Sequence, residues 1–196
     1  NATLAKASAT ATIVDQDGAP SLFVDDIVVA EGSDGAATAT FTVRLSTATG
    51  TTVTVSFTTA DGTALVNRDY LSASGELAFA PGETAKTVAV SVLGDTVDEH
   101  DETFLLILSN PSHATLGDGQ AQATILDDDL PPSLSINDLS LVEGDANNGE
   151  ITITVTLSAA SEKTITVNYA TENGTALAGS DYEAVSGSIT FAPGET

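Results

Sequence analysis

The chain has 196 residues and carries 28 Asp and Glu against 5 Lys and Arg, a formal net charge of −23 at pH 7. So acidic a chain excludes binding to nucleic acid or to anionic lipid, because both need basic patches. Disorder is not indicated, since 41% of the residues are hydrophobic and only 17% are charged. There is no Cys, and no apolar run approaches the roughly 20 residues of a membrane helix. We therefore expect neither disulfides nor direct membrane insertion.

An internal repeat divides the chain. Residues 21–84 align without a gap to residues 133–196, and 29 of the 64 aligned residues are identical. The same offset of 112 relates Ala11–Ile13 to Ala123–Ile125. Self-similarity at a fixed period is the signature of a tandem array. We predict the last strand of a preceding repeat with its linker in residues 1–19, a complete domain in 20–131, and the N-terminal part of a further domain in 132–196.

Within the complete domain, hydrophobicity alternates with a period of two, which indicates strands rather than helices. In chain order, the predicted strands lie near residues 21–30, 40–45, 53–57, 75–80, 88–92, 104–108 and 121–125. Asp-Gly, Pro-Gly and Asn-Pro pairs separate them as turn signals. Seven short antiparallel strands predict an all-β fold, an immunoglobulin-like sandwich with Greek-key connections. The chain should hold such sandwiches in tandem, one complete and one incomplete, joined through the stiff Leu130-Pro-Pro-Ser133 linker into a rod.

The acidic residues gather in two stretches. Five lie in the segment Asp95–Glu102, and three are consecutive at Asp127–Asp129, directly after the last strand. The sandwich topology should bring both stretches to one pole, within reach of the loop that carries Asp69. Crowded carboxylates repel one another, and Ca²⁺, with six to eight oxygen ligands in flexible geometry, would neutralise them better than Mg²⁺. The alternative is a solvated acidic pole that only keeps the protein soluble.

Short motifs along the whole chain carry a resemblance to a known family. They are Val29-Ala-Glu-Gly32, Asp61-Gly-Thr-Ala64, Arg68-Asp-Tyr70, Phe79-Ala-Pro-Gly-Glu83, Glu102-Thr-Phe104, Leu108-Ser-Asn-Pro111 and Ile125-Leu-Asp-Asp-Asp129. Together they resemble the Calx-β domain, known from sodium–calcium exchangers, integrin β4 and many bacterial surface and adhesin proteins. The resemblance implies an immunoglobulin-like sandwich and, as in the calcium-binding members, carboxylate ligands for Ca²⁺.

The resemblance also implies which residues would bind the metal. In the complete domain they are Glu31, Asp69, Asp95, Glu99, Glu102, Asp127, Asp128 and Asp129. Asp15 and Asp17 match the terminal Asp run of the preceding repeat, and Glu143 and Asp181 belong to the further one. Gly94 and Thr96 stand where the exchangers have additional carboxylates, which implies one or two ions. For Glu102 the alternative is a structural role at the start of its strand.

Signs of catalysis are weak. His100 and His113 have no plausible Ser nucleophile or partner His. Carboxylate pairs alone could suggest a glycosidase, but the aromatic residues that line sugar clefts are scarce, with no Trp and three Tyr. Tyr70 and Tyr182 occupy matching turn positions and are interpreted as packing residues. We expect that the protein is not an enzyme.

The function expected is that of a calcium-binding structural module in an extracellular, secreted or cell-surface repeat protein of bacterial type. Bound Ca²⁺ would order the acidic loop and fix the angle between neighbouring repeats, giving a rigid rod or surface fibre. One alternative is a filament subunit: the last repeat lacks its final strands, and the first 14 residues resemble a free final strand that an identical subunit could accept. Another is an adhesive module that binds a glycan or a protein through its loops.

Overall fold

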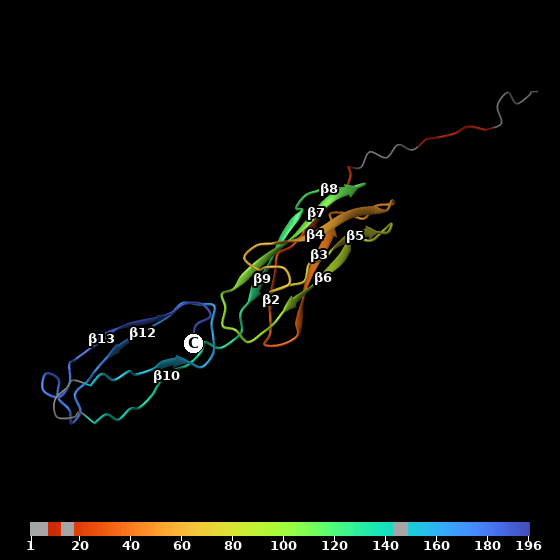
Figure 1. The fold of residues 1–196 in the computed structure, drawn as a ribbon. Coiled ribbons are helices and arrows are strands. Elements are labelled where there is room, and N and C mark those ends of the chain that lie inside the picture. Colours follow the sequence, from red (N-terminus) through yellow and green to blue (C-terminus); the bar gives the residue numbers. More distant parts are fainter. Residues whose placement is uncertain (1–7, 13–17, 143–148) are drawn as a thin grey trace, which may run out of the picture.

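The computed structural model describes residues 8–12, 18–142 and 149–196. Throughout these ranges the secondary structure consists of strands and turns, without α-helix. Accordingly, no helix in the described part of the chain is long and apolar enough to cross a membrane. A complete β-sandwich and a smaller, more open unit lie end to end in an elongated molecule (Figure 1). The all-β tandem arrangement predicted from the repeat is confirmed.

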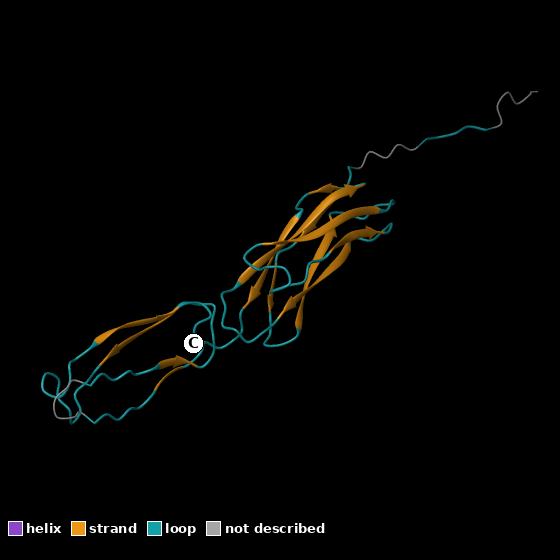
Figure 2. Ribbon diagram, viewed as in Figure 1, coloured by secondary structure: helices purple, strands orange, loops and turns teal. Residues whose placement is uncertain are grey.

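Two sheets form the complete sandwich (Figure 2). The four-stranded sheet has the order β6-β3-β1-β8, with β6 at Ala85–Leu93, β3 at Ala36–Leu45, β1 at Ser21–Val24 and β8 at Thr115–Leu116. The five-stranded sheet has the order β2-β9-β7-β4-β5, with β2 at Ile27–Ala30, β9 at Gln120–Leu126, β7 at Glu102–Ser112, β4 at Val53–Asp61 and β5 at Ser74–Phe79.

The first predicted strand, residues 21–30, is in fact two strands that belong to different sheets. β1 pairs antiparallel with β3, whereas β2 pairs parallel with β9. The chain changes sheets at Asp25 and Asp26, and Asp26 Oδ1 accepts a hydrogen bond of 2.7 Å from the Gln122 backbone N–H. β8 also pairs parallel, with β1. The remaining strand pairs are antiparallel as predicted, and these two parallel pairs are the exceptions.

Aromatic residues fix the core next to the loop between β4 and β5. The ring of Tyr70 stacks on Phe104 with centroids 4.3 Å apart, and Phe41 meets Phe104 edge to face at 5.9 Å. All three rings are buried, and such pairs contribute about 0.5–1.5 kcal/mol each beyond their buried area. The Tyr70 hydroxyl donates to Asp61 Oδ1 at 2.6 Å. Tyr70 is therefore a packing residue, as predicted, and it anchors its neighbour Asp69.

The second unit consists of β10 (Leu134–Ile136), β11 (Val155–Leu157), β12 (Ile165–Ala170) and β13 (Ser186–Phe191), paired as two two-stranded sheets. Its inner face is open: Ile136 is 66% exposed, whereas its counterpart in the repeat, Val24, is 3% exposed. At the other end of the chain, residues 8–12 form no strand. The remainder of the strand predicted for the preceding repeat lies outside the described residues.

Strand register places the acidic segments at one end of the complete sandwich. Glu102, the first residue of β7, lies opposite Ile125 near the end of β9, and Ala30, the last residue of β2, lies beside Leu126. The loop after β2, the loop 94–101 between β6 and β7, and residues 127–129 after β9 therefore meet there. The loop of Asp69 joins them, because the Leu93 N–H donates to the Asp69 carbonyl at 2.9 Å. We call this end of the sandwich the acidic pole.

Candidate metal centre

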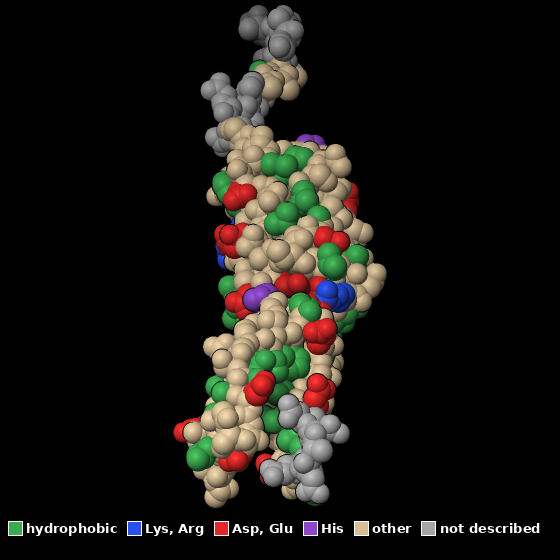
Figure 3. Space-filling model, turned by 60° about the vertical axis from the view of Figure 1, so that its left-hand side comes forward, with side chains coloured by type: hydrophobic (Ala, Val, Ile, Leu, Met, Phe, Trp, Pro, Cys, Tyr) green, Lys and Arg blue, Asp and Glu red, His purple; other side chains and the backbone are tan. Residues whose placement is uncertain are grey.

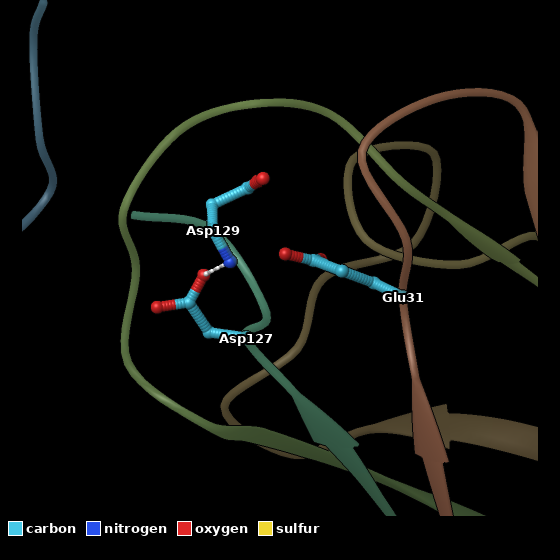
Figure 4. A group of neighbouring side chains, drawn as sticks. All are labelled: Glu31, Asp127 and Asp129. Atoms are coloured by element: carbon cyan, nitrogen blue, oxygen red, sulfur yellow. Dashed lines mark hydrogen bonds between the residues drawn. The ribbon is translucent and has the colours of Figure 1, made fainter. Parts of the chain in front are cut away.

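Three carboxylates converge where β2 and β9 end. Glu31 follows β2 directly, and its backbone N–H donates to the Leu126 carbonyl at 3.2 Å. This bond holds Glu31 beside the segment that carries Asp127 and Asp129, and Figure 4 shows the Glu31 side chain pointing toward both. The Asp129 N–H donates to Asp127 Oδ1 at 3.2 Å, which folds the segment into a turn. One carboxylate oxygen from each of the three lies within 4.8 Å of the others. We call this group the Glu31 trio.

A second group, the Glu102 trio, lies at the same pole and comprises Asp69, Glu99 and Glu102. One carboxylate oxygen from each again lies within 4.8 Å of the others. Asp69 is oriented by its own turn, since its Oδ2 accepts the Leu65 N–H at 2.6 Å. Glu99 is tied to the terminal Asp run, because its backbone N–H donates to Asp127 Oδ2 at 3.1 Å. The two trios thus come from different segments of the chain and are connected by this hydrogen bond.

Burial leaves some of these oxygens without partners. Glu31 is 5% exposed, Asp69 6% and Glu99 7%. Within the described residues, Glu31 Oε1, Glu102 Oε2 and Asp129 Oδ2 are buried and accept no hydrogen bond. A buried polar atom without a hydrogen bond costs about 1–3 kcal/mol, and a charged one costs more. The acidic pole therefore holds buried oxygens that protein groups alone do not satisfy.

The electrostatics of both trios favour protonation when no metal is bound. Burial, followed by the charges of Glu99, Asp95, Asp127 and Asp129, raises the pKa of Glu31 to about 7. Burial and a hydrogen bond shared with Asp69 raise the pKa of Glu102 to about 8. Burial also raises the pKa of Glu99, against the opposing effect of Arg68. Each of these shifts shows that negative charge is destabilised at the pole.

Two protein cations lie at the edge of the pole. Arg68 Nη2 donates to Glu99 Oε1 at 3.0 Å, and its Nε is 3.5 Å from Asp69 Oδ1. Lys163, from the second unit, donates to Asp127 Oδ2 at 3.0 Å. Figure 3 shows acidic side chains, with a basic one among them, around the level where the two units meet. In the described part of the chain, neither Arg68 nor Lys163 forms an ion pair with Glu31 or Asp129.

Six of the predicted ligands are brought together, namely the members of the two trios. Asp95 and Asp128 belong to neither trio and are exposed, although Asp95 is close enough to raise the pKa of Glu31 and Glu99. Asp181 is also exposed. Its Oδ2 accepts the Leu177 N–H at 2.8 Å, as Asp69 does from Leu65, so the turn is conserved between the two units without a trio around it in the described residues. Asp15, Asp17 and Glu143 lie outside the described residues.

Gly94 has a packing role that the sequence interpretation missed. A Cβ at this position would lie 2.0 Å from the Gly32 carbonyl oxygen and 2.7 Å from that of Glu31. A carboxylate therefore cannot replace Gly94 without moving the backbone that presents Glu31. The glycine allows the loop after β6 to approach the loop after β2 closely, and this contact shapes the Glu31 trio.

Three further residues form ion pairs or hydrogen bonds at the acidic pole, although they were not among the predicted ligands. Asp98 is 5% exposed and is paired with Lys163. Asp101 Oδ1 accepts the Asp127 N–H at 3.2 Å, which helps to fix the start of the terminal Asp run. Only the density of acids in the Asp95–Glu102 segment pointed to Asp98 and Asp101. Nothing local in the sequence pointed to Lys163, which is 65 positions away from Asp98.

Chemically, both trios offer carboxylate oxygens alone. Hard divalent cations prefer such ligands, whereas zinc and copper sites usually include His or Cys. His113 lies at the other end of the sandwich, where its Nδ1 is 3.1 Å from the Thr52 carbonyl oxygen. His100 is exposed. The arrangement suits binding of a hard cation by one end of a rigid sandwich.

Comparison with known proteins agrees with this description. The family model "Calx-beta domain" matches residues 15–129 and 134–196. The sodium/calcium exchanger Calx of Drosophila melanogaster is 34% identical over 148 residues, which is 74% of this chain but only 16% of the exchanger. The adhesion G-protein coupled receptor V1 of Danio rerio is 34% identical over 151 residues, covering 74% of this chain and 2% of the receptor.

Solved structures show the same fold. The apo form of the Calx CBD1 domain is 28% identical, with a TM-score of 0.51, and the match covers 57% of this chain and 100% of that domain. The calcium binding domain CBD12 of CALX1.1 is also 28% identical, with a TM-score of 0.51, and the match covers 89% of this chain and 71% of that protein. The second match extends over both units.

Proposed function

The chain belongs to the Calx-beta domain family, and we propose that the acidic pole of its complete domain binds Ca²⁺. The observation that carries the proposal is the Glu31 trio, whose three carboxylates converge and leave Glu31 Oε1 and Asp129 Oδ2 buried without a partner. Ca²⁺ suits such a site, because it takes six to eight oxygens at flexible angles. Mg²⁺ demands a stricter octahedron and retains its water. The relation to a domain described as calcium binding supports the same ion.

In this proposal the Glu31 trio holds the first ion through Glu31, Asp127 and Asp129. The Glu102 trio is a weaker second site, because Arg68 already neutralises Glu99 and Asp69. Asp95 and Asp128 are exposed and contribute to the negative field around both trios. Backbone carbonyls and water supply the remaining oxygens. The same assignment extends by family resemblance to Asp15, Asp17, Glu143 and Asp181 in the neighbouring repeats.

The consequence of binding is stabilisation of the pole. The ion replaces the protons that Glu31 and Glu102 otherwise hold, and it removes the repulsion between loops that come from separate parts of the chain. A ligand that binds only the folded state stabilises it by RT ln(1 + [L]/Kd), which is about 2.7 kcal/mol at one hundred times Kd. We expect the loop 94–101, which carries Asp95 and Glu99, to gain order when the ion binds.

Thermal unfolding of the full chain tests this proposal. The protein is unfolded in excess chelator, in millimolar CaCl₂ and in millimolar MgCl₂. We expect a clear rise in the melting temperature with CaCl₂ and a smaller one with MgCl₂. The Glu31→Gln variant should lose most of the CaCl₂ response. Equal melting temperatures of the unmodified protein in all three solutions would refute calcium binding.

We further propose that the module belongs to an extracellular repeat protein in which successive domains form a rod. The end-to-end arrangement of the two units (Figure 1), the two consecutive prolines of the linker and the relation to an adhesion receptor support this. Free calcium is abundant outside cells, where millimolar affinity suffices for extracellular modules. Surface biotinylation of intact source cells, followed by blotting for the native polypeptide, tests the location: the protein should be labelled, and its absence from the labelled fraction would count against the proposal.

A further inference from the structure

The second unit contacts the acidic pole through the loop 158–164, which joins β11 to β12. Ser161 Oγ donates to Asp98 Oδ2 at 2.7 Å and lies 2.9 Å from the Asp98 carbonyl oxygen. The Glu162 N–H donates to the same carbonyl at 3.0 Å. Ser161 is 2% exposed and Asp98 5%. A contact between separate units that buries both polar partners and satisfies their hydrogen bonds is a specific interface, because each bond demands one relative position.

Three ion pairs, made by two cations, cross this interface in opposite directions. Lys163 of the second unit donates to Asp98 Oδ1 at 2.6 Å and to Asp127 Oδ2 at 3.0 Å. Arg68 of the complete domain pairs with Glu162 of the second unit. Lys163 lowers the pKa of Asp98, and Asp98 in turn raises that of Lys163. Each unit contributes a cation that pairs with acidic residues of the other unit. In the reversed orientation of the loop, Glu162 would face the acidic residues and Lys163 would face Arg68, so that like charges would repel.

The complete domain carries the matching loop, and its sequence differs at the contact positions. Ser46 Oγ accepts the Ser21 N–H at 3.0 Å, as Ser158 Oγ accepts the Ser133 N–H at 2.9 Å. The Thr49 carbonyl accepts the Gly82 N–H at 3.0 Å, as the Ser161 carbonyl accepts the Gly194 N–H at 2.9 Å. The two loops are therefore held by matching hydrogen bonds. Thr49, Gly50 and Thr51 stand at the positions of Ser161, Glu162 and Lys163, so this loop has neither charge.

We propose that Ser161-Glu162-Lys163 is a recognition element that docks its unit onto the acidic pole of the preceding unit, and that this docking needs no metal. The partner it fits is a sandwich pole with an Asp at the position of Asp98, a terminal Asp at that of Asp127 and an Arg at that of Arg68. A unit with the uncharged Thr49-Gly50-Thr51 loop is not docked in this way. The sequence of this loop thus determines whether the junction between two successive units is rigid. It also determines which preceding units a given unit can dock onto.

Distance measurements in the full chain test this proposal. Because the chain has no Cys, Thr40→Cys and Thr166→Cys provide two unique positions for spin labels, one on an exposed strand residue of each unit. Double electron–electron resonance in excess chelator should give a narrow distance distribution. The variant E162G/K163T, which installs the residues of the complete domain's loop, should broaden that distribution at least twofold.

The matched control is E83G/K86T, which removes one Glu and one Lys whose ion pair of 2.8 Å lies within the complete domain. It should leave the distribution narrow. The proposal is overturned if E162G/K163T keeps the narrow distribution, or if the labelled parent is broad in chelator and narrows only with CaCl₂. Calorimetric titration of the same samples with CaCl₂ reports calcium binding separately, so that failure of the docking proposal and failure of the proposed function are distinguishable.

Discussion

Arg68 Nη2 lies 3.0 Å from Glu99 Oε1, which places a protein cation at the edge of the Glu102 trio. In the Glu31 trio, by contrast, Lys163 Nζ lies 3.0 Å from Asp127 Oδ2, while Glu31 forms no ion pair with any of the described residues. The two acidic groups at one pole therefore differ in how much of their charge the protein already neutralises. We therefore expect the Glu31 trio to bind Ca²⁺ more tightly than the Glu102 trio.

Replacing Glu31 should weaken calcium binding more than replacing Glu102. Glu31→Gln removes a proposed ligand whose buried Oε1 has no hydrogen-bond partner in the described residues. We expect the Kd for the tighter ion to rise at least tenfold, equivalent to about 1.4 kcal/mol. Glu102→Gln should affect the weaker site, with a smaller change at the tighter one. Isothermal titration calorimetry measures both. Glu76→Gln, an exposed position on β5, is the control, and an equal effect of all three substitutions would contradict the ranking.

Removing Arg68 should destabilise the metal-free protein. Arg68→Gln leaves Glu99 and Asp69 buried without their cation, and the free energy of unfolding in chelator should fall by about 1–3 kcal/mol. Saturating CaCl₂ should recover part of the loss, because the ion takes over the neutralisation. Urea unfolding measures the change. Lys86→Gln, which breaks an ion pair with the exposed Glu83, should change stability by no more than about 0.5 kcal/mol.

The stability of the metal-free protein should decrease as the pH rises from 5 to 8. Glu31 and Glu102 have pKa values of about 7 and about 8, raised from 4.5. Between pH 4.5 and the raised pKa values, Glu31 and Glu102 hold protons in the folded protein that they have released in the unfolded chain. The free energy of unfolding therefore falls with increasing pH. The destabilisation is absent at low pH and complete above the folded-state pKa values. Melting temperatures in chelator across this range should therefore decline.

Calcium should reverse this pH dependence. The ion binds the deprotonated carboxylates, so its stabilising effect should be small at pH 5 and large at pH 8. Proton release on binding, obtained from calorimetry in two buffers of different ionisation enthalpy, provides an independent measurement. A metal-free melting temperature that rises from pH 5 to pH 8 would contradict the assigned pKa directions.

The close approach at Gly94 gives a prediction about packing. Gly94→Ala places a Cβ 2.0 Å from the Gly32 carbonyl oxygen, so the two loops must separate, and overpacking of this kind costs about 1–3 kcal/mol. Calcium affinity should fall together with stability, because the displaced loop presents Glu31. Gly50→Ala is the matched control, since nothing lies within 4 Å of its added Cβ. Wild-type stability and affinity in Gly94→Ala would show that the contact is not required.

Much of the fold could be predicted from local patterns. Alternation at Phe41, Val43 and Leu45 reflects a sheet with one buried face, and all three are buried. The meeting of Asp127–Asp129 with the loop 94–101 followed from sandwich topology, which fixes where neighbouring strands begin and end. The division of residues 21–30 between two sheets could not be predicted, because Asp25 and Asp26 interrupt the alternation only briefly and their partners, Arg44 and Gln122, are distant in sequence.

For the candidate site, too, the sequence predicts the residue types but not the contacts between distant residues. Its carboxylates stand out by composition, whereas their pairing depends on contacts between separate loops. Lys163 pairs with Asp98 of the other unit, and Arg68 pairs with Glu99 of another loop. Arg68 stands in the Arg68-Asp-Tyr70 motif, but neither ion pair follows from a local pattern. The role of Gly94 depends on a single backbone contact with Gly32. The acidic residue types thus indicated a cation site, and the tertiary structure determines which carboxylates converge in it.

The measurement that tests calcium binding most directly is a crystal structure of the full chain grown in CaCl₂, with diffraction recorded at a long wavelength where calcium scatters anomalously. We predict an anomalous peak between Glu31, Asp127 and Asp129, with carboxylate oxygens at about 2.3–2.6 Å from the ion. A weaker peak is expected at Asp69, Glu99 and Glu102. No anomalous peak at the Glu31 trio in crystals that contain millimolar calcium would contradict the proposed function.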